Sequence, residues 1–524
     1  RARVEAEKSA AVIELLQDLL GSANPQAAKG PDYPVRELLD EFSLTVWDRL
    51  ADQPQVEATI RQTLGNAYRE LSVYDKAQTH LRRALALQQQ LHGENSAEAA
   101  AALADIAWLH LDRDEWDAAE EAARASLRIR AALDAGAGPR VAASKDQIGV
   151  ILQRRGSYAN AEAWHHEALR LLQSVSPRPT LAIAQVHENL ALARQHLGDY
   201  PAAEARYLAA LNALSELMPA AHPRISAVRL NYASVLRAMG RYVDAETELR
   251  RILAAMHEAY DDAHPAVAET RLLLGTVLRL QGRLEEAQAM LRAALAAYEA
   301  KYPAGHVAVG ISLNALGNAL RDAGRWDDAV AVLQRALEMR RRVGGPQHPG
   351  MANGETNLAL ALWAAGRQEE ALPHAEAAVS LCHSIYDDSH PRLAEALYAY
   401  GRVLQALGRA DEASAALEES LTIRRDALPA GHIAIGETLA ALAVTQMQRG
   451  AETEARAAAT EAQQVLSARL AEDDWRLLEA RTLLAADAGA PASTAEKLAT
   501  LPGTPVSVVR WAAATSSSGT QATP

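Results

Sequence analysis

The fold is decided by the stretch GISLNALGNALRDAGRWDDAVAVLQRALEMRRRV, residues 310–343. Its apolar residues recur at intervals of three and four, which predicts two helices joined by a short turn. Gly324 stands where the first helix should end, a position that favours a residue in the left-handed conformation. Gly317 and Ala329 are small, which allows two helices to cross at about 8–10 Å. The stretch therefore predicts a helical hairpin.

The hairpin pattern recurs at a constant interval of 42 residues, without an insertion or deletion. Three columns of equivalent positions define it. An alanine column runs through Ala77, Ala119, Ala161, Ala203, Ala245, Ala287, Ala329, Ala371, Ala413 and Ala455. A column of only Gly or Ala lies twelve residues earlier, and a turn column holds Gly156, Gly198, Gly240, Gly282, Gly324, Gly366, Gly408 and Gly450, with Ser72 and Asp114 in the first two units. One hairpin cannot bury its apolar face alone, so the units are expected to stack.

This pattern resembles the tetratricopeptide repeat (TPR), whose motif appears as Gly317 followed by Gly324-Arg325-Trp326-Asp327-Asp328-Ala329. The interval is longer than the usual 34 residues and is similar to that of kinesin light chains, which also carry His-Pro before the first helix. Here His-Pro stands at 222–223, 264–265, 348–349 and 390–391. The resemblance implies an all-α TPR superhelical solenoid of about ten hairpins over residues 58–477, whose first helices line a concave, peptide-binding face.

Both ends of the chain depart from the repeat. Residues 1–57 are expected to form N-terminal helices that cap the stack, and residues 478–487 to end a C-terminal capping helix. Residues 488–524 are low in complexity and are predicted to lack order, with VSVVRW (506–511) as the one part suited to docking. The N-terminal region carries EAEK at 5–8, VRELLD at 35–40 and ADQPQVEA at 51–58. With these, residues 1–93 also resemble the region that follows the membrane helix in bacterial eukaryotic-like Ser/Thr protein kinases, which implies that a kinase domain and a membrane helix precede Arg1.

Composition excludes several classes of protein. The 524 residues include one Phe and 49% hydrophobic residues, which favours close-packed helices rich in Ala and Leu. A net charge of −13 argues against nucleic-acid binding, and the single cysteine excludes a disulfide framework. No apolar run reaches the roughly 18 residues of a membrane span. We therefore expect no span in this chain.

The sequence contains no motif for catalysis, a cofactor or a metal. Phosphate-binding, dinucleotide-binding, kinase and zinc-protease signatures are all missing. Six histidines share one column at 222, 264, 306, 348, 390 and 432, but equivalent residues of stacked hairpins lie too far apart for one metal ion. We therefore predict that they begin helices. Cys382 reads as a buried small side chain.

Candidate binding residues come from projecting the first helices onto the concave face. Arg237, Arg279 and Arg321 occupy one column in three consecutive hairpins, and five asparagines project nearby, namely Asn189, Asn231, Asn314, Asn318 and Asn357. Amides pair with a peptide backbone and guanidinium groups grip carboxylates, so these residues suit an extended acidic peptide. Ordinary solvated helix surface is the alternative for the arginines.

Chaperone-binding members of the family hold a C-terminal carboxylate with two asparagines and flanking basic residues. Asn318 and Asn357 fall at the asparagine positions, but Asn314, Glu395 and Ala399 stand where the basic residues would be. Capture of a chaperone tail is therefore not expected, whereas contact with a peptide backbone remains open.

Three functions compete. The first is a non-catalytic protein- or peptide-binding module, the sensor or scaffold arm of a bacterial membrane Ser/Thr kinase, on the periplasmic or extracytoplasmic side. The second is a free-standing cytoplasmic scaffold or cargo adaptor of kinesin-light-chain type. The third, an enzyme within the array, lacks any acid–base or nucleophile–base set. The ligand, the side of the membrane and the oligomeric state are not fixed by the sequence.

Overall fold

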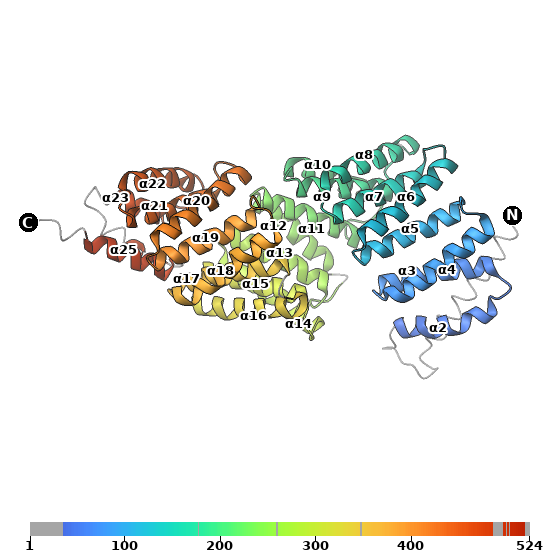
Figure 1. The fold of residues 1–524 in the computed structure, drawn as a ribbon, viewed down its shortest axis with the longest axis horizontal. Coiled ribbons are helices and arrows are strands. Elements are labelled where there is room, and N and C mark those ends of the chain that lie inside the picture. The colour runs from blue at the N-terminus through green and yellow to red at the C-terminus, as the bar shows by residue number, and fades with distance from the viewer. Residues whose placement is uncertain are drawn as a thin grey trace, which may run out of the picture. The chain divides into compact units, whose positions relative to one another are not determined.

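The computed structural model describes residues 35–176, 178–257, 260–345, 348–485, 496–498, 500–501 and 504–518. Within these ranges the regular structure is entirely helical, which confirms the all-α prediction. The chain divides into an N-terminal unit, Arg1–Met239, and a C-terminal unit, Gly240–Pro524. Figure 1 shows the succession of helices in each unit. The helix predicted at residues 1–20 lies outside the described residues.

The N-terminal unit consists of one entry helix, four hairpins and a closing helix. Each hairpin pairs an odd-numbered helix with the next even-numbered one, starting with α3 and α4. In chain order the helices are α2 (Val35–Arg49), α3 (Pro54–Glu70), α4 (Tyr74–His92), α5 (Ala97–Asp112), α6 (Trp116–Leu133), α7 (Pro139–Arg154), α8 (Tyr158–Val175), α9 (Leu181–His196), α10 (Tyr200–Ser215) and α11 (Pro223–Ala238).

The C-terminal unit begins with one helix and continues with five hairpins, from α13/α14 to α21/α22. Its described helices are α12 (Tyr242–Met256), α13 (Pro265–Leu280), α14 (Leu284–Lys301), α15 (Val307–Asp322), α16 (Trp326–Gly344), α17 (Pro349–Ala364), α18 (Gln368–Ile385), α19 (Pro391–Ala406), α20 (Ala410–Ala427), α21 (Ile433–Gln448), α22 (Glu452–Ser467), α23 (Trp475–Ala485) and α25 (Val506–Ser518).

The small residues of the repeat lie where two helices of a hairpin touch. A Cβ atom added to Gly317 would stand 2.5 Å from Cγ of Leu333, which is far inside van der Waals contact. Gly149 is equally close to the ring of His165. The alanine column is fully buried throughout, as at Ala329. The predicted role of both columns in close helix crossing is confirmed.

The turn between the two helices of a hairpin requires a left-handed residue. Gly324 has φ of +73°, and the other turn glycines fall between +75° and +84°. Ser72 and Asp114 adopt the same conformation, with φ of +58° and +57°, although their Cβ atoms disfavour it. The turn position predicted from the sequence is therefore correct in all units.

The six column histidines cap helices, as predicted. In each case the ring Nδ1 accepts a hydrogen bond from the backbone N–H two residues later, at 3.0–3.2 Å. Three of the rings also stack on a tyrosine, for example His264 on Tyr260 with centroids 4.0 Å apart. The imidazole thus replaces the Ser, Thr or Asp that usually satisfies the first free N–H groups of a helix.

First helices of neighbouring hairpins contact one another, in the N-terminal unit α3 with α5 and α7 with α9. In the C-terminal unit α13 contacts α15, α15 contacts α17, α17 contacts α19, α19 contacts α21 and α21 contacts α23. No comparable contacts join the described second helices of neighbouring hairpins. Because the first helices approach one another more closely, they lie on the inner side of each stack, and we call their exposed surface the inner face.

The helix at the N-terminal end of the described chain agrees with the prediction from the sequence, whereas the helix at the C-terminal end was predicted only in part. Helix α2 packs on α3, with Leu39, Val46 and Leu50 buried as its apolar spacing predicts. In the segment 488–524, which was predicted to lack order apart from docking by residues 506–511, the structure places helix α25. The prediction of disorder was wrong for residues 512–518, and residues 506–511 do dock, because the apolar partners of α25 lie on α17 and α23 rather than nearby in sequence. Among the described helices, none is long and apolar enough to cross a membrane.

Candidate functional site

The inner face is built from side chains that pair across neighbouring first helices with a fixed offset. Each pair is separated by 43 residues, one more than the repeat, because the helices are slightly staggered. The pairs are Gln62–Asp105, Arg69–Asp112, Asp146–Asn189, Glu188–Asn231, Arg279–Asp322 and Asn314–Asn357. Many polar side chains of this face are therefore already hydrogen-bonded to the neighbouring first helix, and only their remaining donors and acceptors could contact a ligand.

Asn189 is held in such a network in the N-terminal unit. Its Nδ2 donates to both carboxylate oxygens of Asp146 at 3.1 Å, and its Oδ1 accepts from Gln185 at 3.1 Å. Asp146 also contacts Nδ1 of the fully buried His165 at 2.6 Å. Both the nitrogen and the oxygen of the Asn189 amide are therefore hydrogen-bonded within the protein, and the side chain serves to join α9 to α7.

Asn231 lies on the next helix and donates to Glu188 at 3.4 Å. Arg224 donates to the same carboxylate. Burial raises the pKa of Glu188, although the charge of Arg224 and the amide of Asn231 oppose that shift. The group is a compact acid–amide–arginine cluster that faces the inner side of the N-terminal unit.

The three arginines of the predicted ladder divide between the units. Arg237 lies near the end of α11 in the N-terminal unit, whereas Arg279 and Arg321 belong to α13 and α15 of the C-terminal unit. These two converge on Asp322, which the sequence analysis missed: Arg279 lies 2.5 Å and Arg321 3.1 Å from its carboxylate. Burial acts to raise the pKa of Asp322, but the two guanidinium groups outweigh it and the pKa lies below its usual value.

This triad retains one unit of positive charge, since two arginines share a single carboxylate. Both guanidinium side chains remain about one-fifth exposed, at 21% for Arg279 and 22% for Arg321. Their unused N–H groups are therefore available to a carboxylate from outside. The pairing with Asp322 fixes their direction, which lowers the entropy cost of binding such a group.

An amide cluster lies one to two helical turns earlier on the same face. Asn357 donates to Asn314 at 3.0 Å and to Asn353 at 3.3 Å, and Asn314 donates to Asn353 at 3.3 Å. Asn353 was not predicted; only its place one turn before Asn357 on α17 would have indicated it. The structure thus brings together Asn314 and Asn357 as expected.

Asn318 stands between the amide cluster and the arginines. Residues 314, 318 and 321 lie on one face of α15, because they are four and three positions apart. In the part of the chain that the structure describes, the Oδ1 atom of Asn318 is buried and has no hydrogen-bond partner. A buried acceptor without a donor costs about 1–3 kcal/mol.

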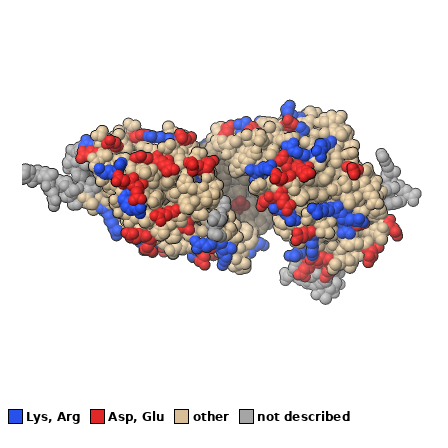
Figure 2. Space-filling view, in the orientation of Figure 1, with Lys and Arg blue, Asp and Glu red and all other residues tan. Residues whose placement is uncertain are grey.

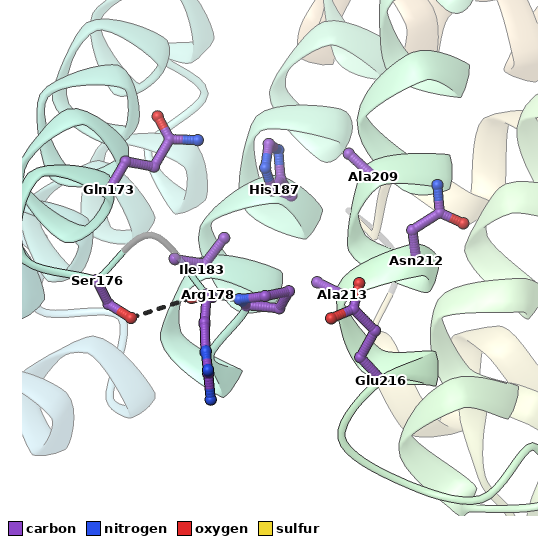
Figure 3. A pocket seen from close by; sticks show the side chains of 10 residues that line it. Gln173, Ser176, Arg178, Ile183, His187, Ala209, Asn212, Ala213 and Glu216 are labelled. Atoms are coloured by element: carbon purple, nitrogen blue, oxygen red, sulfur yellow. Dashed lines mark hydrogen bonds between the residues drawn. The ribbon is translucent and has the colours of Figure 1, made fainter.

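A hollow of about 510 Å³ lies elsewhere, between the second helices α8 and α10 with α9 as its floor. Figure 3 shows His187 and Ile183 in its centre, Gln173 and Ser176 on one side and Asn212 on the other. Burial lowers the pKa of His187 to about 4, so its ring is neutral near pH 7. Its Nδ1 has no hydrogen-bond partner among the described residues. The hollow is separate from the inner face.

The described residues hold no group of three or more His, Cys, Asp or Glu side chains placed to bind a metal ion. Cys382 is buried, as predicted, and burial raises the pKa of its thiol to about 11, which suppresses the reactive thiolate. On the outer surface acidic and basic side chains are intermixed, as Figure 2 shows for one face. Many form local pairs, such as Arg409 with Glu412 at 2.7 Å.

Comparisons with known proteins agree with this architecture. The sequence profile of the tetratricopeptide repeat matches residues 56–132, 140–217, 224–300, 309–382 and 351–426. No curated protein matches the sequence. Among solved structures, a kinesin-light-chain-like protein of Podospora anserina with nearly identical TPR-like repeats is 22% identical, with a TM-score of 0.34 over 39% of this chain and 98% of that chain.

Two further solved structures are similar. BtubC (BKLC) from P. vanneervenii is 19% identical, with a TM-score of 0.35 over 44% of this chain and 91% of that chain. The apo form of RapI is 14% identical, with a TM-score of 0.43 over 55% of this chain and 98% of that chain. Similarity at this level identifies no ligand. Because the repeat profile covers more than half of the sequence, and small, turn and capping residues stand where each hairpin needs them, this chain belongs to the tetratricopeptide repeat family.

Proposed function

We propose that this chain is a non-catalytic scaffold that binds an extended, acidic peptide or protein segment on the inner face of its C-terminal unit. The observation that carries the proposal is the row Asn314, Asn318 and Arg321 on α15, in which the partly exposed Arg321 shares the single carboxylate of Asp322 with Arg279. The amides of this row supply partners for a peptide backbone. The arginine triad beyond them supplies a surplus positive charge for a side-chain carboxylate.

The experiment is a selection of acidic peptides from a display library on the full chain, followed by titration calorimetry with single variants. Arg321→Ala removes one charge-assisted contact while Asp322 keeps Arg279, so we expect binding to weaken at least tenfold. Asn318→Ala should weaken binding about fivefold. The matched control is Arg325→Ala, because Arg325 pairs with Asp328 at the exposed hairpin turn. Equal affinities of all three variants and the unaltered chain would refute the proposal.

We further propose that the chain is the sensor or scaffold arm of a bacterial membrane Ser/Thr protein kinase and lies on the extracytoplasmic side. The support is the resemblance of residues 1–93 to the region after the membrane helix of such kinases. The test is the reading frame upstream of the codon for Arg1, which should encode a kinase domain and then an apolar segment of about 20 residues. A start codon shortly before Arg1 would instead favour a free-standing cytoplasmic scaffold or cargo adaptor of kinesin-light-chain type.

A further inference from the structure

The C-terminal helix α25 lies against the inner side of the same unit to which the peptide site belongs. It contacts α17 and α23, both of which are first helices or continue their layer. Figure 1 shows α25 at the C-terminal end of the stack, beside these helices. The residues of α25 that donate hydrogen bonds to the end of α17 and its turn lie 144 positions from their partners in the sequence. Part of the chain therefore occupies a surface of the kind that we propose for ligands.

Polar contacts seat the start of α25 on the end of α17. Ser507 is buried, and its Oγ donates to the backbone oxygen of Trp363 at 2.5 Å and accepts from Nε2 of Gln368 at 3.2 Å. Arg510 donates to the backbone oxygen of Gly366 at 3.4 Å. The backbone oxygen of Trp363 also accepts from the N–H of Gly366 at 3.0 Å, so Ser507 adds a second hydrogen bond to a carbonyl at the end of α17.

Apolar contacts hold the rest of the segment. Leu498, Val508 and Ala512 are buried in one cluster with Trp363 and Leu478, at exposures of 0–5%. Val508 and Ala512 are four positions apart, so they form one side of α25. The next residue, Ala513, is exposed, which shows that only one face of the helix is bound. An amphipathic helix in a groove has this pattern.

The turn of the α17/α18 hairpin is shaped for this contact. A Cβ atom on Gly366 would lie 2.9 Å from Cγ1 of Val506, whereas equivalent additions to Gly282, Gly408 and Gly450 would meet nothing within 4 Å. Gly366 alone among these four turns is therefore covered by another part of the chain.

The surface beneath α25 is held together by aromatic and ionic contacts among α17, α19 and α23. Trp363 occupies the column that holds Arg279 and Arg321 in earlier hairpins. Its ring lies 6.5 Å from that of Trp475 on α23, and the guanidinium group of Arg402 lies 4.4 Å from its centroid. Arg402 in turn binds Glu479 of α23. These side chains are packed together between α17, α19 and α23, and α25 covers Trp363 on one side.

We propose that helix α25, Val506–Ser518, is a ligand in cis for the inner face formed by α17 and α23, and that a partner helix must displace it to bind there. The partner would be an amphipathic helix with a small hydroxyl residue followed by apolar residues one and five positions later. This inference rests on the proposed function, since both use the layer of first helices. A tethered segment acts at a millimolar effective concentration, so it lowers the apparent affinity of a free competitor at least tenfold.

The test uses the full chain and a labelled peptide of residues 496–518 as the probe, with binding measured by fluorescence anisotropy. Ala512→Glu places a charge on the buried side of α25 and should release it, whereas Ala513→Glu is the matched control on the exposed side. We expect Ala512→Glu to bind the peptide at least tenfold more tightly than the control and the unaltered chain. Hydrogen exchange at residues 508–514 should rise only in Ala512→Glu.

Two outcomes would overturn the proposal. One is an unchanged exchange rate at residues 508–514 in Ala512→Glu, because the buried face would then not hold the helix. The other is a released helix without any gain in peptide binding. Should Ala512→Glu unfold the stack, the double variant Gln368→Cys and Ser507→Cys replaces it. Under mild oxidation a disulfide should form between the two cysteines and abolish binding of the peptide. Reduction of the disulfide should restore the weak binding of the unaltered chain. Failure of the disulfide to form would also contradict the docking.

The two proposals fail in different ways. Arg321→Ala should weaken acidic peptides while leaving binding of the 496–518 peptide to the Ala512→Glu chain unchanged. If Arg321→Ala does not weaken acidic peptides while the 496–518 peptide still binds the Ala512→Glu chain, the acidic site is refuted. If that peptide does not bind while Arg321→Ala still weakens acidic peptides, the competition by α25 is refuted.

Discussion

Arg402 donates two parallel hydrogen bonds to Glu479, at 3.0 and 2.8 Å, and so joins two helices whose paired residues are 77 positions apart. Both side chains are almost inaccessible to solvent, at 1% and 4%. Burial acts to lower the pKa of Arg402, but the charge of Glu479 outweighs it and the pKa is raised. The guanidinium group of Arg402 packs on the ring of Trp363, so the pair connects α17, α19 and α23.

Breaking this pair should destabilise the C-terminal unit strongly. Glu479→Ala leaves the buried guanidinium group without a counter-ion and should cost about 3–5 kcal/mol of unfolding free energy. The double variant Arg402→Met with Glu479→Leu removes both charges and should recover most of that loss. Urea unfolding followed by tryptophan fluorescence measures both, since Trp363 and Trp475 flank the site. A double variant as unstable as Glu479→Ala would contradict this account.

The close contact of Gly317 with Leu333 predicts a second effect on stability. Gly317→Ala introduces a Cβ atom into space already filled by Leu333, so it should destabilise the chain by about 1–3 kcal/mol even though alanine favours helices. Leu333→Ala should relieve the overlap. The double variant should therefore lose less unfolding free energy than the sum of the losses in the two single variants. Gly431→Ala is the control, because the nearest atom there is 3.9 Å away. Thermal unfolding of the three variants decides the matter.

The left-handed turns of the first two hairpins predict a gain in stability. Ser72 has φ of +58°, a conformation that costs a non-glycine residue about 1–2 kcal/mol. Ser72→Gly should therefore stabilise the N-terminal unit by about 1 kcal/mol. Ser157→Gly serves as the comparison, since Ser157 has a φ of −85° and should gain nothing. Chemical unfolding that shows the same change for both would rule out turn strain as the cause.

Buried neutral histidines predict a loss of stability in acid. Burial, with the nearby charges of Arg61 and Lys76, lowers the pKa of His80 to about 4. In the unfolded chain the ring would titrate near 6.5, so the unfolded state binds more protons between pH 6.5 and 4. Stability contributed by His80 is therefore complete above about pH 6.5 and is lost as the pH falls toward 4.

The measurement is the unfolding free energy at pH 7.5 and pH 5 for the unaltered chain and for His80→Gln. Ser43 contacts Nε2 of the ring at 3.2 Å, whereas Arg61 faces Nδ1 at 3.4 Å, and a guanidinium donor there disfavours a proton on Nδ1. The decrease between the two pH values should be about 1–2 kcal/mol smaller in the variant. An identical decrease in both proteins would show that His80 does not contribute.

The sequence was informative wherever one hairpin determines its own structure. Gly317, the turn glycines and the capping histidines could be predicted because helix crossing, turn conformation and capping depend on residues within about 20 positions of each other. The recurrence of these residues at one interval made the stack predictable as well.

Pairing between hairpins was harder to predict. Asp322 was missed because the helix stagger shifts its contact with Arg279 by one residue from the repeat interval, to 43, and Asn353 was missed because it contacts Asn314 at a different separation, 39 residues. The helix α25 was predicted only in part: the apolar residues of 506–511 indicated docking, but its helical structure and its partners could not be read from the sequence. Those partners, Trp363 and neighbouring residues, are far away in the chain.

The most direct test of the proposed inner-face site is a hydrogen-exchange footprint of the full chain with and without a selected acidic peptide. The proposal predicts that the peptide slows exchange in α15 and in the facing parts of α13 and α17, and leaves the second helices α14 and α16 unchanged. Slower exchange confined to second helices, or to the hollow between α8 and α10, would contradict it.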